Sequence, residues 1–534
     1  MEIRPNTTET LRYQDLLIDR TLAQDITQEL SLPDYQPEIK RLLRVSATVQ
    51  PPTRYIGGGN IEFSGNVDFN ILYAGEDGAL YCFPTSADYT LRTAADGENT
   101  LSYLPDENMT CYALIEPDLV NGRVAGPRKL TVRCRMRAHV RAWGGSSPEE
   151  IWTGKLCGTP QRLRTELTVA RVLNGTGAPL QVSDEILLER ASESDDTRIV
   201  TAEACVLPEE ITTAADRVSC RGQLCLKLLL QRDVRESDAE TTEPMLPTVI
   251  SRKIPFTADI PVEGLLPGGE AVVQGSCTEL NLILEDGKIL CEAELLLDAR
   301  TQHRESLSYT ADLCCIGQHT TVETSAEHAC RPVRCINTNF SQNETLAAKE
   351  TSLPTAARLA DVHGTVLPDS IALTSEGSRC VVSGTCRYSL IYLSDGELAS
   401  RELELPFRYT LDMGQTPAGG ESAIAYDHSV RIVNCKARLD ERDGRLNIDA
   451  ELCLSLRLWE NVTFYPVATV KVDAPCQTPV GSRTIYYPLP GETLWSVAKR
   501  YCSSVEQLST KNHLPAAIRA DDPASLGGAH IVVI

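Results

Sequence analysis

Imidazole and thiol side chains, the ligands that suit transition metals, come closest together at two places in the sequence. His328, Cys330 and Cys335 form one group, and Cys220 and Cys225 repeat its spacing of five residues. On a β-strand an odd offset points two side chains to opposite faces of the sheet. These thiols are therefore not expected to meet around one tetrahedral zinc ion.

Motifs of catalysis and cofactor binding do not occur in the sequence. It has no Gly-x-x-x-x-Gly-Lys phosphate loop, no strand-associated Gly-x-Gly-x-x-Gly and no His-Glu-x-x-His. Gly57-Gly58-Gly59 lies in an extended segment without a helix to receive a phosphate, and is expected to be a flexible turn. The eight histidines are scattered, so no Ser-His or Cys-His nucleophile pair is indicated. We expect no enzyme activity, no metal and no cofactor.

The last stretch of the chain, Tyr486 to Ile534, carries the signals of a small binding module. Pro490-Gly491-Glu492-Thr493 supplies a glycine turn and a threonine that can cap a helix starting at Leu494. A second amphipathic segment runs from Val505 to Asn512, and Ile531-Val532-Val533-Ile534 supplies a closing apolar strand. The expected order of elements is βααβ, which is too small for a conventional active site.

This stretch resembles a LysM domain in Gly491-Glu492-Thr493-Leu494-Trp495 and in Asn512-His513-Leu514. In that family a groove between two loops binds N-acetylglucosamine polymers or, in some members, protein. The segment Ala516 to Leu526 is longer than the usual loop, and it either closes or widens the groove. Trp495 is either a contact residue of the groove or part of the core of the module. The resemblance implies these groove residues: Gly491, Glu492, Thr493, Leu494 and Trp495 on one lip, and Asn512, His513, Leu514 and Pro515 on the other.

Composition limits the kinds of partner. The chain has 534 residues, enough for three or four domains, and a net charge of −22 with a pI near 4.9. Such an acidic chain is a poor match for nucleic acid or an anionic membrane. Arg133, Arg135, Arg137 and Arg141 recur at strand spacing, and they are expected to form a solvated strand face.

The sequence suggests a cytoplasmic location. The residues after Met1 lack the apolar core of a secretory signal, and no apolar run approaches the length of a membrane-spanning helix. In that compartment the 19 cysteines are expected to be reduced and to serve as small buried hydrophobic residues. Cys314-Cys315 is included in that expectation.

The chain before the module repeats itself. Gly65 leads to Tyr73 through alternating apolar residues, and the same offset leads from Gly222 to Leu230 and from Gly384 to Tyr392. We expect three units of mostly antiparallel β-structure, at 1–150, 155–315 and 318–480, followed by the module at 484–534. Asn121-Gly122, Asp286-Gly287 and Asp443-Gly444 are expected hairpin turns, and Gln36 to Leu43 is a short helix candidate.

These motifs resemble SPOCS domains of sporulation proteins, and Pro37 to Leu43 is similar to the segment that precedes them. Three such units and one terminal LysM domain are the layout of the SipL-like family of spore coat morphogenetic proteins. The second unit departs most from the pattern, with Leu230 in place of Tyr and an acidic insertion at Asp233 to Glu243.

The resemblance implies a mother-cell scaffold at the forespore surface. Its LysM domain would dock onto a SpoIVA-like coat morphogenetic ATPase, and other coat proteins are possible further partners. The alternative is a protein of the spore cortex or envelope whose LysM domain binds N-acetylglucosamine polymers of peptidoglycan.

Overall fold

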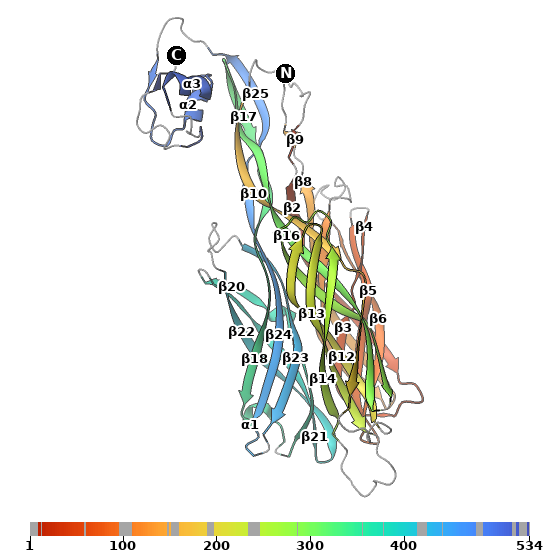
Figure 1. Ribbon diagram of the computed structural model, residues 1–534. Helices are drawn as coiled ribbons and strands as arrows, with labels where there is room; N and C mark the ends of the chain where they lie inside the picture. The colour runs from red at the N-terminus through yellow and green to blue at the C-terminus, as the bar shows by residue number, and fades with distance from the viewer. Residues whose placement is uncertain are drawn as a thin grey trace.

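The computed structural model describes most of the chain. The described residues are 9–11, 13–57, 60–94, 109–146, 149–150, 160–188, 197–232, 246–285, 287–354, 356–376, 379–413, 424–440, 442–476, 484–514, 520–522 and 531–532. Within them the protein is mainly β, and its sheets are antiparallel. The expectation of a mainly β chain is confirmed. The strands fall into three groups along the chain, which we call the first, second and third units (Figure 1).

The first unit spans residues 13–146 and consists of two sheets. The first strand and the last two strands in sequence form one sheet, in the order β2-β8-β7. The strands between them in sequence form the other sheet, in which β3, β4 and β6 all pair with β5. Side chains of both sheets share one apolar core. The strands are β2 (Tyr13–Ser31), β3 (Ile39–Val49), β4 (Thr53–Gly57), β5 (Asn60–Gly75), β6 (Leu80–Ala94), β7 (Thr110–Gly126) and β8 (Lys129–Ser146).

The second unit, 160–315, has a similar arrangement, except that its second strand, β11, also pairs with the last strand, β16. Its first strand pairs with the last, the last pairs with the strand before it, and the middle strands form the order β12-β13-β14. The strands are β10 (Pro160–Thr176), β11 (Leu180–Leu187), β12 (Thr197–Ala214), β13 (Arg217–Arg232), β14 (Thr248–Pro261), β15 (Glu270–Glu285) and β16 (Lys288–Cys315).

The third unit, 327–464, again pairs its first strand with its last, in the order β18-β24-β23. Its other sheet is centred on β21. The elements are β18 (Glu327–Leu346), α1 (Ala348–Thr351), β19 (Arg358–Val366), the 3-10 turn η4 (Pro368–Ser370), β20 (Ala372–Glu376), β21 (Arg379–Ser394), β22 (Glu397–Asp412), β23 (Ile424–Leu439) and β24 (Leu446–Phe464).

Each central strand carries a glycine directly opposite an aromatic residue of the next strand. The aromatic side chain lies so close that a Cβ on the glycine would come within 2.7 to 2.9 Å of one of its atoms. A side chain at this place would force the ring away, and the ring in turn covers the backbone that the glycine leaves bare. The pairs are Gly65 with Tyr89, Gly222 with Phe256 and Gly384 with Phe407.

A small apolar core joins the three units. Strands β3, β12 and β19 each slip in register by one residue where they pair with the central strand. In each of these strands one bulge has a buried extra residue, which is aimed into the space between the units. The three bulge residues Leu43, Val200 and Ala360 belong to one cluster with Leu72, Leu229 and Ile391.

Two local expectations are wrong. The helix candidate Gln36 to Leu43 runs into β3, where pairing with β5 fixes an extended backbone from Ile39. Asn121-Gly122 is not a turn but lies inside β7, opposite Arg133 and Val132. A Cβ at Gly122 would meet Val45 and Leu42 at 2.7 and 2.9 Å, so this glycine permits close sheet packing.

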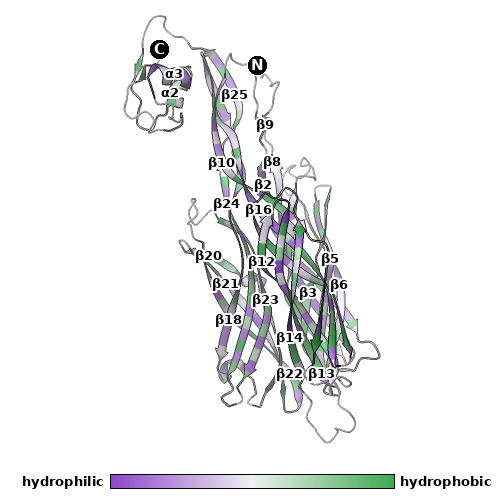
Figure 2. Cartoon of the chain, in the orientation of Figure 1, coloured by the Kyte–Doolittle hydropathy of each residue, from purple (hydrophilic) through white to green (hydrophobic). Residues whose placement is uncertain are grey.

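A narrow stalk leaves the body of the three units and ends at the C-terminal module (Figure 1). It contains the paired ends of β10 and β16 and the ribbon of β17 (Gln318–Thr324) with β25 (Val467–Pro475). A short pair, β1 (Glu9–Thr10) with β9 (Glu149–Glu150), lies nearby. Apolar and polar residues alternate along many strands, as expected for sheets with one buried face (Figure 2).

Replacing Gly384 by alanine is expected to destabilise the protein by about 1–3 kcal/mol, because the new Cβ overlaps the ring of Phe407. Urea unfolding followed by circular dichroism measures the change. Gly126→Ala is the matched control, since its Cβ would meet only the Cβ of Lys129, at 4.0 Å. Equal midpoints for Gly384→Ala and Gly126→Ala would contradict the packing role of Gly384.

Candidate functional site

The C-terminal module consists of two short helices and a two-stranded pair. Its elements are β26 (Ile485–Tyr486), α2 (Leu494–Arg500), α3 (Val505–Lys511) and β27 (Ile531–Val532), and β26 pairs with β27. Thr493 caps α2 by accepting a hydrogen bond from the Ser496 amide at 3.1 Å. Leu494, Val497, Leu508 and Ile531 form the core.

The residues predicted for the first lip have internal roles. Gly491 adopts φ +89°, a conformation that favours glycine. The Glu492 carboxylate accepts from the Leu489 amide at 2.8 Å and from the Tyr486 hydroxyl at 2.6 Å, and it pairs with Arg500 at 2.6 Å. Leu494 is buried in the core. Of these residues, the Gly491 turn is therefore the part that can meet a ligand.

The second lip follows α3. The Asn512 amide nitrogen donates to the Leu508 carbonyl at 2.8 Å, and Leu514 packs on the core of the module. His513 is exposed and has the left-handed φ of 51°. Pro515 lies outside the described residues, and so does the segment 516–526 except for 520–522. Of the described part of this lip, His513 is the most open to solvent.

Trp495 is buried and fastens the module to the stalk. Its side chain is 5% exposed, and the indole Nε1 donates to Asp312 Oδ2 of β16 at 2.8 Å. Lys499, one turn further along α2, pairs with the other oxygen of Asp312 at 2.5 Å. A carboxylate shared by an indole and an ammonium makes charge-assisted hydrogen bonds, although the Asp312 side chain is still 25% exposed. The indole side chain is thus engaged within the chain.

A second contact comes from β10. The Gln161 side chain donates to the Ser503 carbonyl at 3.1 Å and accepts from the Val505 amide at 2.9 Å. In addition, the Gly317 amide donates to the Cys502 carbonyl at 2.8 Å. The module is therefore oriented by contacts from β10, β16 and the turn before β17.

The side of the module next to the Gly491 turn exposes large apolar side chains. Ile485, Tyr487 and Leu489 are 53%, 71% and 64% exposed. They follow one another in the segment that leads into α2. Exposed apolar residues in one place are typical of a contact surface.

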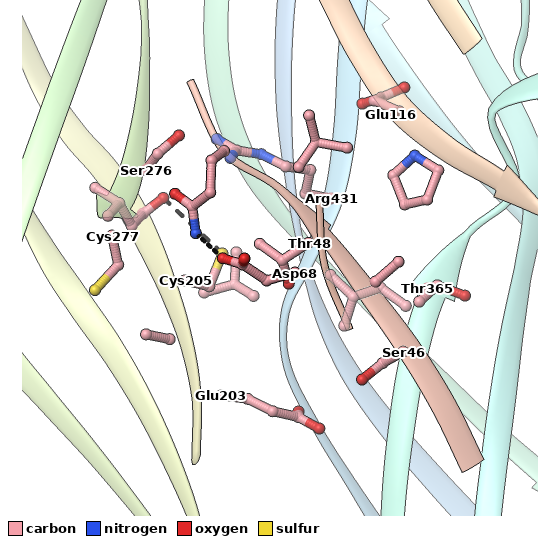
Figure 3. Close-up of a pocket in the computed structure, with 18 of the residues that line it drawn as sticks. Ser46, Thr48, Asp68, Glu116, Glu203, Cys205, Ser276, Cys277, Thr365 and Arg431 are labelled. Atoms are coloured by element: carbon pink, nitrogen blue, oxygen red, sulfur yellow. Dashed lines mark hydrogen bonds between the residues drawn. The ribbon is translucent and has the colours of Figure 1, made fainter. Parts of the chain in front are cut away.

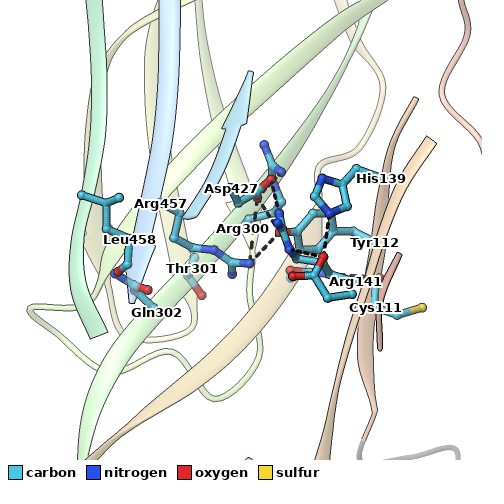
Figure 4. A network of polar contacts seen from close by, with 12 residues as sticks. Cys111, Tyr112, His139, Arg141, Arg300, Thr301, Gln302, Asp427, Arg457 and Leu458 are labelled. Atoms are coloured by element: carbon cyan, nitrogen blue, oxygen red, sulfur yellow. Dashed lines mark hydrogen bonds and ion pairs between the residues drawn. The ribbon is translucent and has the colours of Figure 1, made fainter. Parts of the chain in front are cut away.

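The three units meet at a buried carboxylate, Asp427 (Figure 4). Arg300 of the second unit reaches it at 2.7 Å and Arg141 of the first unit at 2.9 Å. Arg457 lies 3.9 Å away and donates to the Tyr112 hydroxyl at 2.7 Å, and that hydroxyl in turn donates to Asp427. All three units therefore contribute a charge to one contact.

The three arginines occupy matching places in the fold. Each lies on the last strand of its unit, β8, β16 or β24, and faces a residue of the strand before it. Only in the third unit is that facing residue an acid. The pairs are Arg141 with Tyr112, Arg300 with Val272 and Arg457 with Asp427.

Aromatic rings compensate for the surplus of positive charge. Each guanidinium lies over a ring that belongs to a different unit, which is a favourable arrangement for a desolvated cation. The distances to the ring centroids are 4.8 Å for Arg300 on Tyr112, 4.5 Å for Arg457 on Trp143 and 5.2 Å for Arg141 on Trp459.

Arg141 corrects the expectation of a solvated arginine face. Arg135 is about half exposed and pairs with Asp25 at 3.1 Å, as a surface residue does. Arg141 is 4% exposed, because the third unit covers this end of β8. Of these arginines, Arg135 is therefore exposed to solvent and Arg141 is buried in the contact between the units.

A second buried cluster also draws on all three units. Asp361 of the third unit pairs with Arg44 of the first at 2.7 Å and with Lys227 of the second at 2.6 Å. Glu203 links Arg44 at 3.1 Å to His363 at 2.8 Å. Burial alone would raise the pKa of Asp361, but Arg44 and Lys227 hold it below its ordinary value.

A cavity of about 830 Å³ lies between the two clusters and is lined by all three units (Figure 3). Burial raises the pKa of its Glu116 to about 7, although the nearby Arg431 opposes the shift. Burial also raises the pKa of the lining thiols, to about 11 for Cys277 and about 12 for Cys435. These thiols are protonated at neutral pH and are poor nucleophiles.

The cysteines singled out in the sequence mostly serve packing. Cys330 is buried beside Trp143 and Trp459, and its thiol donates to Asn461 at 3.8 Å. Cys314 is a buried free thiol, as expected, whereas Cys315 is disulfide-bonded, so the expectation of reduced cysteines is wrong for Cys315. Sequence spacing missed another group, formed by His319, Cys476 and Cys502, because these residues are far apart in the chain.

No protein-family model, no curated protein and no solved structure matches the chain. None of the helices in its described part has the length and apolar character needed to cross a membrane.

Asp427→Asn is expected to destabilise the protein by about 3–5 kcal/mol at pH 7, because three buried arginines lose their anion. Burial opposes ionisation of Asp427, yet Arg300, Arg141 and Arg457 lower its pKa below the ordinary value. The stabilisation is therefore present above the pKa of the unfolded chain, about 3.9, and is lost as the pH falls further.

Denaturant unfolding from pH 7 to pH 3 tests this prediction. The stability gap between wild type and Asp427→Asn should narrow below about pH 4. Asp184→Asn is the control, because Asp184 pairs with a half-exposed Arg252 and should cost less than about 1 kcal/mol. A gap that does not change with pH would contradict the role of the charge.

Trp495→Phe is expected to loosen the module from the stalk by removing the indole donor to Asp312. The loss of a hydrogen bond to a charged group, about 1.5–3 kcal/mol, should raise the detached population at least about tenfold. Hydrogen exchange of the Val505 amide, which donates to Gln161, and of the Gly317 amide, which donates to the Cys502 carbonyl, measures this population. Tyr486→Phe removes a donor within the module instead and should leave the exchange of these two amides unchanged. Equal exchange of both amides in wild type and Trp495→Phe would contradict the prediction.

Proposed function

We propose that this chain is a non-enzymatic scaffold of spore coat assembly that docks through its C-terminal LysM-like module onto a SpoIVA-like morphogenetic ATPase. The site of action is the forespore surface, on the cytoplasmic side of the mother cell. The observation that carries the proposal is the orientation of the module. Its tryptophan is fastened to the stalk, and it presents Ile485, Tyr487 and Leu489 to solvent.

A scaffold needs a binding surface held at a defined distance from its body. The stalk provides that distance, and the contacts of Asp312 and Gln161 set the orientation of the module. A preoriented surface loses less conformational freedom on binding than a tethered one. This arrangement supports docking of a large partner.

The body also supports a scaffold rather than a catalyst. Its buried acids Asp427 and Asp361 are engaged with cations that join the units, and its cavity thiols are protonated. The recurring strand order and the recurring glycine and aromatic pairs favour three related units of the SPOCS type. Three related surfaces in one body allow several weak contacts with an assembling coat, which raises the overall affinity.

A second candidate function is binding of N-acetylglucosamine polymers. The exposed Tyr487 ring beside the Gly491 turn favours it, since an amphipathic aromatic side chain can pack against the apolar face of a sugar.

Exchanging Tyr487 and Leu489 together for alanine is expected to weaken binding of the full-length chain to the purified ATPase at least about tenfold. Biolayer interferometry measures the affinity. The matched control is Tyr35→Ala with Leu187→Ala, which removes a tyrosine and a leucine of the body that are at least as exposed. The control should bind as wild type does.

Calorimetric titration with N-acetylglucosamine oligomers separates the two candidates. The second candidate would replace the proposal if wild type binds the oligomers but not the ATPase, and if the double variant Tyr487→Ala with Leu489→Ala shows no heat of binding to the oligomers. ATPase binding that this exchange leaves unchanged would move the docking surface away from this part of the module.

A further inference from the structure

Three metal-ligating side chains converge where the module meets the stalk. His319 lies on β17, Cys476 follows β25, and Cys502 follows α2 of the module. Their ligand atoms all lie within 4.8 Å of one another, and Cys502 Sγ is 3.6 Å from His319 Nδ1. The residues thus come from two stalk segments and from the module itself.

The separation of the Cys502 and His319 ligand atoms suits one tetrahedral ion. Zinc bonds of about 2.3 Å to sulfur and about 2.0 Å to nitrogen place neighbouring ligand atoms roughly 3.5–3.8 Å apart. The separation of Cys502 Sγ and His319 Nδ1 falls in that range. Two thiolates and one imidazole form a donor set that zinc prefers over magnesium and calcium.

The backbone holds these ligands in place through one residue, Gly317. Its amide donates to the Cys502 carbonyl at 2.8 Å, and its carbonyl accepts from the Cys476 amide at 2.9 Å. Cys502 itself adopts φ 49°, an uncommon conformation for a residue with a side chain. Such strain persists where surrounding contacts enforce it, and it often marks a functional position.

We propose that His319, Cys476 and Cys502 bind one zinc ion that fastens the module to the stalk. Cys502 is buried and His319 is exposed, so the fourth coordination position faces solvent and takes a water molecule. The ion joins three chain segments that Gly317 already holds together, and it makes the orientation of the module dependent on metal. This role is separate from the exposed surface at Tyr487 and does not rest on the proposed partner.

Zinc binding to the metal-free full-length chain tests the proposal. Competition with a chromophoric chelator should show one tight site in wild type, weakened at least tenfold by His319→Ala or Cys476→Ser. His328→Ala removes another exposed histidine and Cys277→Ser another cysteine, so these two variants should bind as wild type does. Circular dichroism verifies that every variant is folded.

Cobalt substitution gives a second readout. Wild type and both controls should show the thiolate-to-cobalt charge-transfer band and the visible bands of a tetrahedral site, and Cys476→Ser should lose intensity in both. Zinc affinity and cobalt spectra that do not change in His319→Ala and Cys476→Ser would overturn the proposal. The proposal is also overturned if wild type binds zinc no more tightly than His319→Ala and Cys476→Ser do.

Discussion

The arrangement of the body depends on one buried carboxylate. An ionised Asp427 would be costly to remove from water, and three arginines, one from each unit, offset that cost. The arginines outnumber the acid, and the faces of Tyr112, Trp143 and Trp459 accommodate the remaining positive charge. Because each guanidinium lies over a ring of another unit, separating any one unit from the body would break at least one of these contacts.

The same principle extends along the contact between the units. Asp361 joins all three units a second time, with Arg44 and Lys227, and beyond the cavity the bulged residues Leu43, Val200 and Ala360 close an apolar core. Specific charge pairs set how the units are placed, and apolar burial supplies the larger stabilisation. On the stalk, Asp312 and Gln161 bind the module and hold it in one orientation relative to the body. A binding surface far from the body thereby acquires a defined direction.

Sequence patterns predict what is local and miss what depends on tertiary contact. Alternation of apolar residues and the spacing from Gly65, Gly222 and Gly384 indicate antiparallel strands, because both signals act within one strand. Asn121-Gly122 is misleading, since close packing against β3 requires the glycine as much as a turn would. Burial of Arg141 depends on a unit nearly three hundred residues away, and Trp495 finds its partner Asp312 on the stalk. No spacing rule connects His319 with Cys476 and Cys502, for the same reason.

The central claim is that the three units form one cooperative body around shared buried charges, and native-state hydrogen exchange with mass spectrometry tests it most directly. In increasing urea, amides of β8, β16 and β24 should lose protection together, with one common free energy of opening. Opening of these strands in three separate steps, at clearly different urea concentrations, would contradict the claim and describe three independent domains on a chain.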